Sequence, residues 1–272
     1  MASGGVKGDD ATWREDVADF APPVRVEPSP RWVRVVLAGR TVADSKQPML
    51  HVSYGRPIRP GSRKPELPTY FFASDEVDTS ILEPADVVDG RQWWHANVED
   101  RIVEYAAWSY AEPTGVVRDL AGHITFDWDQ MDAWYEEAEE IYEHARDPQH
   151  RVDVLTSTRQ IEVTFNGQKL ASSGRPRLLF ETSLPTRYYL PAENVNFDYL
   201  EPSSLVTRCP YKGIAKFWSV KDVGREGRNV AWSYPDPIAE NPKLKDLVAF
   251  YNERVDITLD GELLARPLTP WS

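Results

Sequence analysis

An internal repeat limits the fold of this chain more than any other feature. Val33–Gly39 and Ile161–Gly167 each alternate apolar and polar residues, reach a glycine and continue into a second apolar stretch. Alternation with a period of two, followed by a glycine turn, is typical of a β-hairpin. Two such hairpins far apart in one chain predict two copies of one β-rich unit.

Three further matches follow in the same order and at a nearly constant interval. The matched segments are Leu67-Pro68-Thr69 with Leu184-Pro185-Thr186, Leu82-Glu83-Pro84 with Leu200-Glu201-Pro202, and Ala107-Trp108-Ser109-Tyr110 with Ala231-Trp232-Ser233-Tyr234. Four matches in one order are not a coincidence. We expect two antiparallel β modules, over residues 29–146 and 155–272, preceded by a mobile N-terminal arm over residues 1–28.

Each repeat is predicted to end in a short helix. In residues 129–145, apolar side chains recur at helical spacing and glutamates cover the remaining positions. The apolar set is Met131, Trp134, Ala138 and Ile141. Asn241 is a suitable N-cap, and Pro242 suits the first position of a second helix. The predicted fold class is therefore mainly β with short helices.

Composition excludes several classes of function. The chain has 272 residues, with 31 Lys and Arg against 43 Asp and Glu, for a net charge of −12. A surface of this charge repels phosphate, so neither nucleic acids nor anionic membranes are expected partners. Cys209 is the only cysteine, so no disulfide can form within the chain. The sequence shows no long apolar run and no N-terminal signal, which predicts a cytoplasmic protein.

The second repeat resembles a known family. Its segments Tyr188–Pro191, Thr207–Gly213 and Ala231–Tyr234 look like those of the bacterial domain of unknown function 427 (DUF427) family in its tandem form. The resemblance implies compact, mostly antiparallel modules similar to the β-tent fold, which also houses the thalidomide-binding domain of cereblon and several zinc-binding modules. The first repeat departs from the pattern: Gly90–His95 replaces the cysteine motif, and Gly55–Lys64 is a Pro- and Arg-rich insertion.

The cysteine motif is the first candidate for chemistry. In Cys209-Pro210-Tyr211-Lys212-Gly213, proline favours a turn that would bring Lys212 beside the sulfur. A lysine there would favour the thiolate and make Cys209 nucleophilic. Glu181 is the third candidate catalytic group. The alternative is a buried thiol in a structural turn, with Lys212 in water.

Candidate ligand-binding residues surround this motif. Glu181 and Arg187 flank a bend and could form a functional pair or a structural salt bridge. Tyr188 and Tyr189 alternate faces, so one is core and the other could reach a cleft. The aromatic candidates are Tyr188, Tyr211, Trp232, Tyr234, Trp108 and Tyr110. Each Trp shares a strand face with the Tyr two residues later, where the rings could stack on a flat ligand or a cation, or belong to the core.

No metal or cofactor is expected. The five histidines lack paired ligand spacing, and Asp127, Asp129 and Asp132 resemble a calcium loop without its required glycine. No dinucleotide or phosphate-binding fingerprint is present. The sequence favours a small-molecule enzyme of unknown reaction, with its pocket in the second repeat. A non-catalytic small-ligand-binding module with an aromatic cage and a scaffold protein are the alternatives.

Overall fold

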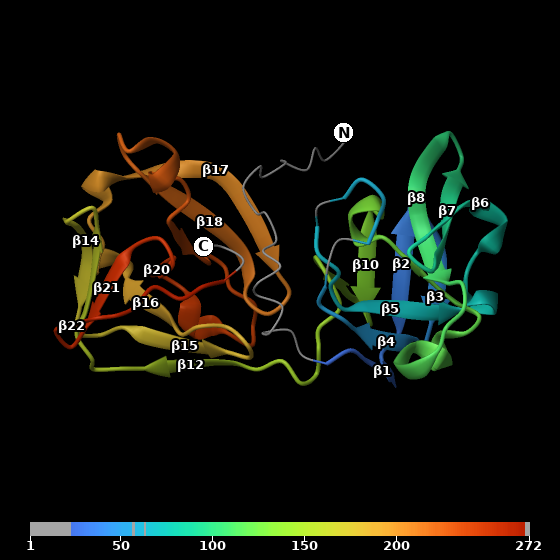
Figure 1. The fold of residues 1–272 in the computed structure, drawn as a ribbon, viewed down its shortest axis with the longest axis horizontal. Coiled ribbons are helices and arrows are strands. Elements are labelled where there is room, and N and C mark those ends of the chain that lie inside the picture. Colours follow the sequence, from blue (N-terminus) through green and yellow to red (C-terminus); the bar gives the residue numbers. More distant parts are fainter. Residues whose placement is uncertain (1–22, 56–57, 63, 270–272) are drawn as a thin grey trace. The chain divides into compact units, whose positions relative to one another are not determined.

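The computed structural model describes residues 23–55, 58–62 and 64–269, which form two compact units (Figure 1). The first unit ends at Asp147 and the second begins at Pro148. Residues 1–22, most of the predicted N-terminal arm, lie outside the described part. Arg25–Pro28 were also assigned to that arm, but they form strand β1 and pair with β4 (Met49–Val52).

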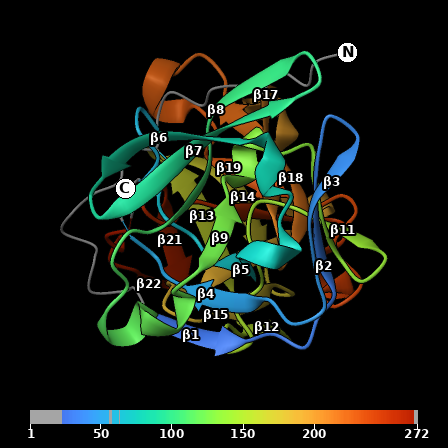
Figure 2. The ribbon, with the colours of Figure 1, turned by 90° about the vertical axis from the view of Figure 1, so that its right-hand side faces the viewer.

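The first module consists of two antiparallel sheets. The larger has the order β1-β4-β5-β9-β8-β7-β6, and the smaller has the order β11-β10-β2-β3. In Figure 2, β9, β5, β4 and β1 follow one another down the view. The remaining strands are β2 (Val33–Leu37), β3 (Arg40–Ser45), β5 (Thr69–Ala73), β6 (Leu82–Val88), β7 (Arg91–Val98), β8 (Arg101–Tyr110), β9 (His123–Phe126), β10 (Ala133–Glu136) and β11 (Glu139–Ile141).

The second module repeats this arrangement strand for strand. Its sheets have the orders β12-β15-β16-β20-β19-β18-β17 and β14-β13-β21-β22. The strands are β12 (Val152–Thr156), β13 (Ile161–Phe165), β14 (Gln168–Ser173), β15 (Arg177–Glu181), β16 (Arg187–Pro191), β17 (Leu200–Cys209), β18 (Gly213–Val220), β19 (Ala231–Ser233), β20 (Leu247–Phe250), β21 (Asp256–Leu259) and β22 (Glu262–Leu263). The predicted tandem of antiparallel β modules is confirmed.

The larger sheet of each module is covered on both faces. One face packs on the smaller sheet, where Tyr70 and Tyr188 join the main core. The other face, called the outer face below, carries a second aromatic cluster. That cluster includes Phe71, Trp93 and Trp108 in the first module, and Tyr189, Phe217 and Trp232 in the second. Neighbouring residues of β5 and β16 therefore serve opposite faces, as strand geometry requires.

The predicted helix over residues 129–145 is wrong. That segment contains a 3-10 turn (Trp128–Gln130) and the hairpin β10–β11, in which Trp134 pairs with Ile141. Trp134 also pairs with Val35, so β10 is needed to extend the smaller sheet. Helix propensity is a weak preference, and this strand pairing overrides it.

The second predicted helix is also wrong. Only Pro242–Leu244 forms a 3-10 turn, and β20 follows it as a buried strand between β16 and β19. Leu244, Leu247, Val248 and Tyr251 recur at helical spacing and were predicted to form the inner face of that helix, but all four residues of β20 are buried. A strand covered on both faces is apolar throughout, so its periodicity does not distinguish it from a helix. In the described part of the chain, the other helical segments are also short 3-10 turns.

Candidate functional site

The cysteine motif forms the turn that its sequence predicts. Cys209 ends β17, Gly213 begins β18, and the amide of Lys212 donates to the carbonyl of Cys209 at 3.3 Å. Gly213 has a φ of 107°, and a Cβ there would lie 3.0 Å from the carbonyl oxygen of Asp236. The motif thus needs glycine at this position. This turn points Lys212 into the module.

Lys212 and Glu181 form a buried ion pair. Lys212 Nζ lies 2.5 Å from the Glu181 carboxylate, and His150 Nε2 donates to the same carboxylate at 3.0 Å. Only 10% of the Lys212 side chain and 7% of the Glu181 side chain are exposed. The ring of Tyr211 stacks on that of His150, with centroids 4.3 Å apart. The structure therefore brings two of the three predicted catalytic groups into direct contact.

The protonation states of this cluster do not favour covalent catalysis. Burial raises the pKa of the Cys209 thiol, and the charge of Lys212 offsets this only in part. Burial would also raise the pKa of Glu181, but Lys212 and His150 lower it to about 2. Burial would lower the pKa of Lys212, but Cys209 and Glu181 raise it overall. At neutral pH the cluster holds a neutral thiol and a mutually neutralised ion pair.

Arg187 pairs with Glu253, whereas Glu181 pairs with Lys212. The guanidinium of Arg187 contacts Glu253 at 2.6 and 2.7 Å, and it donates to Asn252 at 2.9 Å. The guanidinium carbon lies 5.7 Å from the ring centroid of Trp232. Side-chain exposure is 7% for Arg187 and 0% for Glu253. Arg187 is thus a buried cation that projects from β16 on the outer face and is held by a bidentate ion pair.

The remaining predicted residues do not share one cleft. Trp232 donates to the hydroxyl of Tyr189 at 3.0 Å, and both belong to the same cluster as Tyr234. Tyr188 faces the smaller sheet instead. Trp108 and Tyr110 do share a face, with ring centroids 5.3 Å apart, but they lie in the first module.

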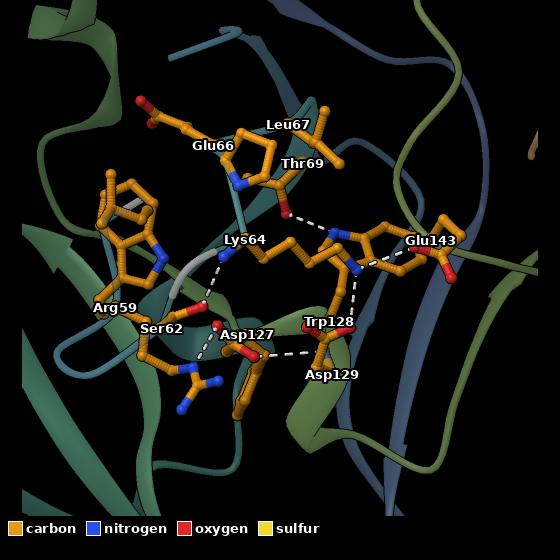
Figure 3. Close-up of a pocket in the computed structure, with 14 residues that line it drawn as sticks. Arg59, Ser62, Lys64, Glu66, Leu67, Thr69, Asp127, Trp128, Asp129 and Glu143 are labelled. Carbon is orange, nitrogen blue, oxygen red and sulfur yellow. Dashed lines mark hydrogen bonds and ion pairs between the residues drawn. The ribbon is translucent and has the colours of Figure 1, made fainter. Parts of the chain in front are cut away.

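A pocket opens in the first module, beside the strand β5 (Figure 3). Thr69 pairs with His51 across β4–β5, just as Arg187 pairs with Leu179 across β15–β16. A threonine thus stands where the second module has its buried arginine. The lining residues are Ile58, Arg59, Ser62, Lys64, Pro65, Glu66, Leu67, Thr69, Trp108, Phe126, Asp127, Trp128, Asp129 and Glu143. These residues define the first-module pocket.

The inserted loop supplies the cations of this pocket. Lys64 Nζ lies 2.7 Å from Asp129 Oδ1 and 2.9 Å from Glu143 Oε2. Arg59 Nε lies 3.1 Å from Asp127 Oδ2. Asp129 is the third residue beyond β9, as Glu253 is beyond β20. Both modules therefore place a carboxylate here, and each pairs it with a cation from a different part of the chain.

Aromatic side chains stiffen the pocket wall. Trp128 donates to Thr69 Oγ1 at 3.0 Å and stacks on Trp134, with centroids 4.1 Å apart and planes inclined by 12°. Trp108 and Phe126 provide further apolar surface. Carboxylates beside tryptophan rings attract cations by direct charge and by the ring quadrupole.

Two ionisation states complete the description of the pocket. Burial raises the pKa of Asp127 to about 6, because Arg59 lowers it less and Asp129 raises it further. For Lys64, burial lowers the pKa, but Asp129 and Glu143 raise it overall. Among the described residues, no group of three or more His, Cys, Asp or Glu side chains is arranged to hold a metal ion.

Sequence reasoning missed this pocket for an identifiable reason. Asp127 and Asp129 were weighed only as calcium ligands, and Gly55–Lys64 was noted only as a departure from the family pattern. Two differences between the repeats mark the pocket, and the sequence shows only one of them. The first repeat alone carries an insertion containing a lysine and arginines. The second difference, Thr69 at the place of Arg187, follows only from strand register, because the matched Leu-Pro-Thr segments align Arg187 with Tyr70.

Comparison with known proteins identifies the two modules. A family model described as a domain of unknown function (DUF427) matches residues 25–137 and again residues 153–261. No curated protein matches the chain. Across the described residues, no helix has the length and apolar character needed to span a membrane.

Proposed function

The chain belongs to the DUF427 family through two tandem copies of its domain, and we propose that it is a small-molecule-binding protein whose first module holds an organic cation. The observation that carries this proposal is the state of Asp129 and Glu143. Both carboxylates line the pocket together with Trp108 and Trp128, and among the described residues both pair with Lys64, whose side chain is 30% exposed. Two carboxylates that pair with the ammonium of a lysine could pair in the same way with the ammonium of a ligand that takes its place.

Comparison of the two ion pairs supports a binding role for the first-module pocket and a structural role for the Arg187–Glu253 pair. The Arg187–Glu253 pair is bidentate and almost fully buried. Lys64, Asp129 and Glu143 are 30%, 46% and 33% exposed. The pairs of Lys64 are thus more exposed than the Arg187–Glu253 pair, so a competing cation displaces Lys64 at a lower cost than Arg187.

The size of the pocket limits the ligand. Its free volume is about 60 Å³, well below the ~300–1,000 Å³ typical of pockets that enclose a whole drug-sized ligand. The pocket therefore accommodates a charged head group and a short chain, with the rest of the ligand in solvent. A net charge of −12 would also draw cations to the protein.

Catalysis at Cys209 is the less supported prediction, because its thiol is protonated and the charges of Lys212 and Glu181 neutralise each other. The bacterial origin implied by the family resemblance, and a cytoplasmic location, belong to this proposal as well. They rest on the tandem pattern and on a single cysteine, which needs no oxidising compartment.

Calorimetric titration tests the proposal. We expect n-butylammonium to bind the full chain and butyrate, its match in size, not to bind. Asp129→Asn should abolish the binding. Glu193→Gln is the matched control, because Glu193 also forms an exposed ion pair, with Arg175, but lies in the second module. Equal affinity for the amine and the acid, or loss of binding in the control, would overturn the proposed function.

A further inference from the structure

The described residues of the inserted loop are held by contacts at its base, within its tip and with the pocket. Its base is closed by two backbone hydrogen bonds of 3.2 Å between Gly55 and Glu66. Beyond that base, Ser62 donates to the carbonyl of Arg59 at 3.0 Å, and the amide of Lys64 donates to Ser62 Oγ at 3.1 Å. These local contacts shape the tip, while Ile58 packs against the outer aromatic cluster and Arg59 pairs with Asp127.

The side chain of Lys64 enters the pocket from the surface loop, with its ammonium at the carboxylates. In Figure 3 its side chain extends across the pocket to the carboxylates of Asp129 and Glu143. The ammonium has three donors and engages two carboxylates. Arg59 pairs with another carboxylate of the pocket, that of Asp127. The side chain in the pocket is thus an unbranched alkyl chain with a terminal ammonium.

The second module shows what a permanent cation looks like at the equivalent place. Arg187 projects from a central strand, and its bidentate contact with Glu253 leaves neither side chain more than 7% exposed. Lys64 projects from a surface loop and remains nearly one-third exposed.

We propose that Lys64 is a built-in competitor at the first-module pocket, and that the external ligand is an unbranched aliphatic primary ammonium, the chemistry of the lysine side chain itself. This inference rests on the proposed function. Two sources supply such a group, a free alkylamine and a lysine of a peptide. Removing Lys64 should raise the affinity for both, because the ligand no longer has to displace it.

The expected gain follows from the strength of the contacts that are lost. Two partly exposed ion pairs hold Lys64 in the pocket. The loss of both pairs corresponds to about a threefold to tenfold change in the dissociation constant of a competing ligand. Lys64→Met keeps most of the stem volume and removes the charge, so it should tighten the binding of n-butylammonium by about that factor.

The experiment is a titration of the full-length unaltered protein, Lys64→Met and Lys64→Gln with n-butylammonium and with the peptide Gly-Lys-Gly. Both variants should bind the amine about three to ten times more tightly, and Asp129→Asn should remove the binding in every background. Tighter binding of the peptide than of the amine would identify a peptide lysine as the ligand, and the reverse would identify a free amine.

The outcomes separate the two claims. Affinity that is unchanged or weaker in both Lys64 variants would overturn the competitor role while leaving the cation pocket in place. Failure of all three proteins to bind either probe would refute the proposed function and this inference together. Circular dichroism and the melting temperature of each variant check that the fold is retained. If one replacement of Lys64 disturbs the fold, the other replacement still tests the competitor role.

Discussion

Glu181→Gln is predicted to destabilise the second module strongly. The substitution leaves the ammonium of Lys212, which is 10% exposed, without its anionic partner. The pKa of Glu181 is about 2, against 4.5 for an unperturbed glutamate. That difference corresponds to about 3 kcal/mol of folding free energy. Breaking a buried pair from one side costs about 3–5 kcal/mol, which agrees. For a module of this size, a loss of ~3 kcal/mol lowers the melting temperature by about 10 °C.

Urea unfolding followed by tryptophan fluorescence, at pH 7 and at pH 3, measures this effect. The folded-state pKa of Glu181 is depressed, so its contribution is fully present above about pH 4.5 and is lost as the pH falls toward 2. The variant should therefore differ from the unaltered protein more at pH 7 than at pH 3. The double variant Glu181→Leu/Lys212→Met should recover much of the stability, because apolar replacement of a buried pair is often neutral. A loss below about 1 kcal/mol at pH 7 would refute the structural role of this pair.

Three further predictions concern single groups. Cys209 should react with iodoacetamide more slowly than free cysteine at pH 7, because burial raises its pKa; a faster reaction would restore the nucleophile hypothesis. The pKa of Asp127 is raised to about 6, so its stabilising contribution is present below about pH 3.8 and lost as the pH rises through 6. Asp127→Asn should consequently reduce the difference in melting temperature between pH 5 and pH 7, and an unchanged difference would contradict the shift. Trp232→Ala should cost about 3–5 kcal/mol in chemical denaturation, because the ring is 6% exposed and its removal leaves a cavity; a loss below ~1 kcal/mol would show that Trp232 is not core.

The repeat was predictable because its signal is local. Alternation through Val33–Gly39 and Ile161–Gly167 specifies a hairpin, and in the structure these segments become β2–β3 and β13–β14. The helices were not predictable in the same way. Trp134 satisfies helical spacing equally well, and only its pairing with Val35, a contact distant in sequence, decides for a strand. The local sequence pattern therefore predicts the hairpins correctly. The segments wrongly predicted as helices are strands because of pairing with residues distant in sequence.

In the candidate site, too, local features were predictable from the sequence and long-range contacts were not. The turn at Cys209–Gly213 follows from proline and glycine within five residues. The partners of Arg187 and Lys64 do not follow from local sequence, because Glu253, Asp129 and Glu143 lie more than sixty positions away. Charge pairs formed across a sheet depend on register, which one sequence specifies only through its hydrophobic pattern. The insertion marked the location of the pocket but did not reveal its partners.

The most direct test of the cation pocket is a crystal structure of the protein with n-butylammonium at saturating concentration. The account predicts density for the amine in the first-module pocket, with its nitrogen about 3 Å from the carboxylates of Asp129 and Glu143 and its chain against Trp128. Lys64 should be displaced from both carboxylates. Lys64 still in contact with Asp129 and Glu143, with the amine absent or bound elsewhere, would contradict the account.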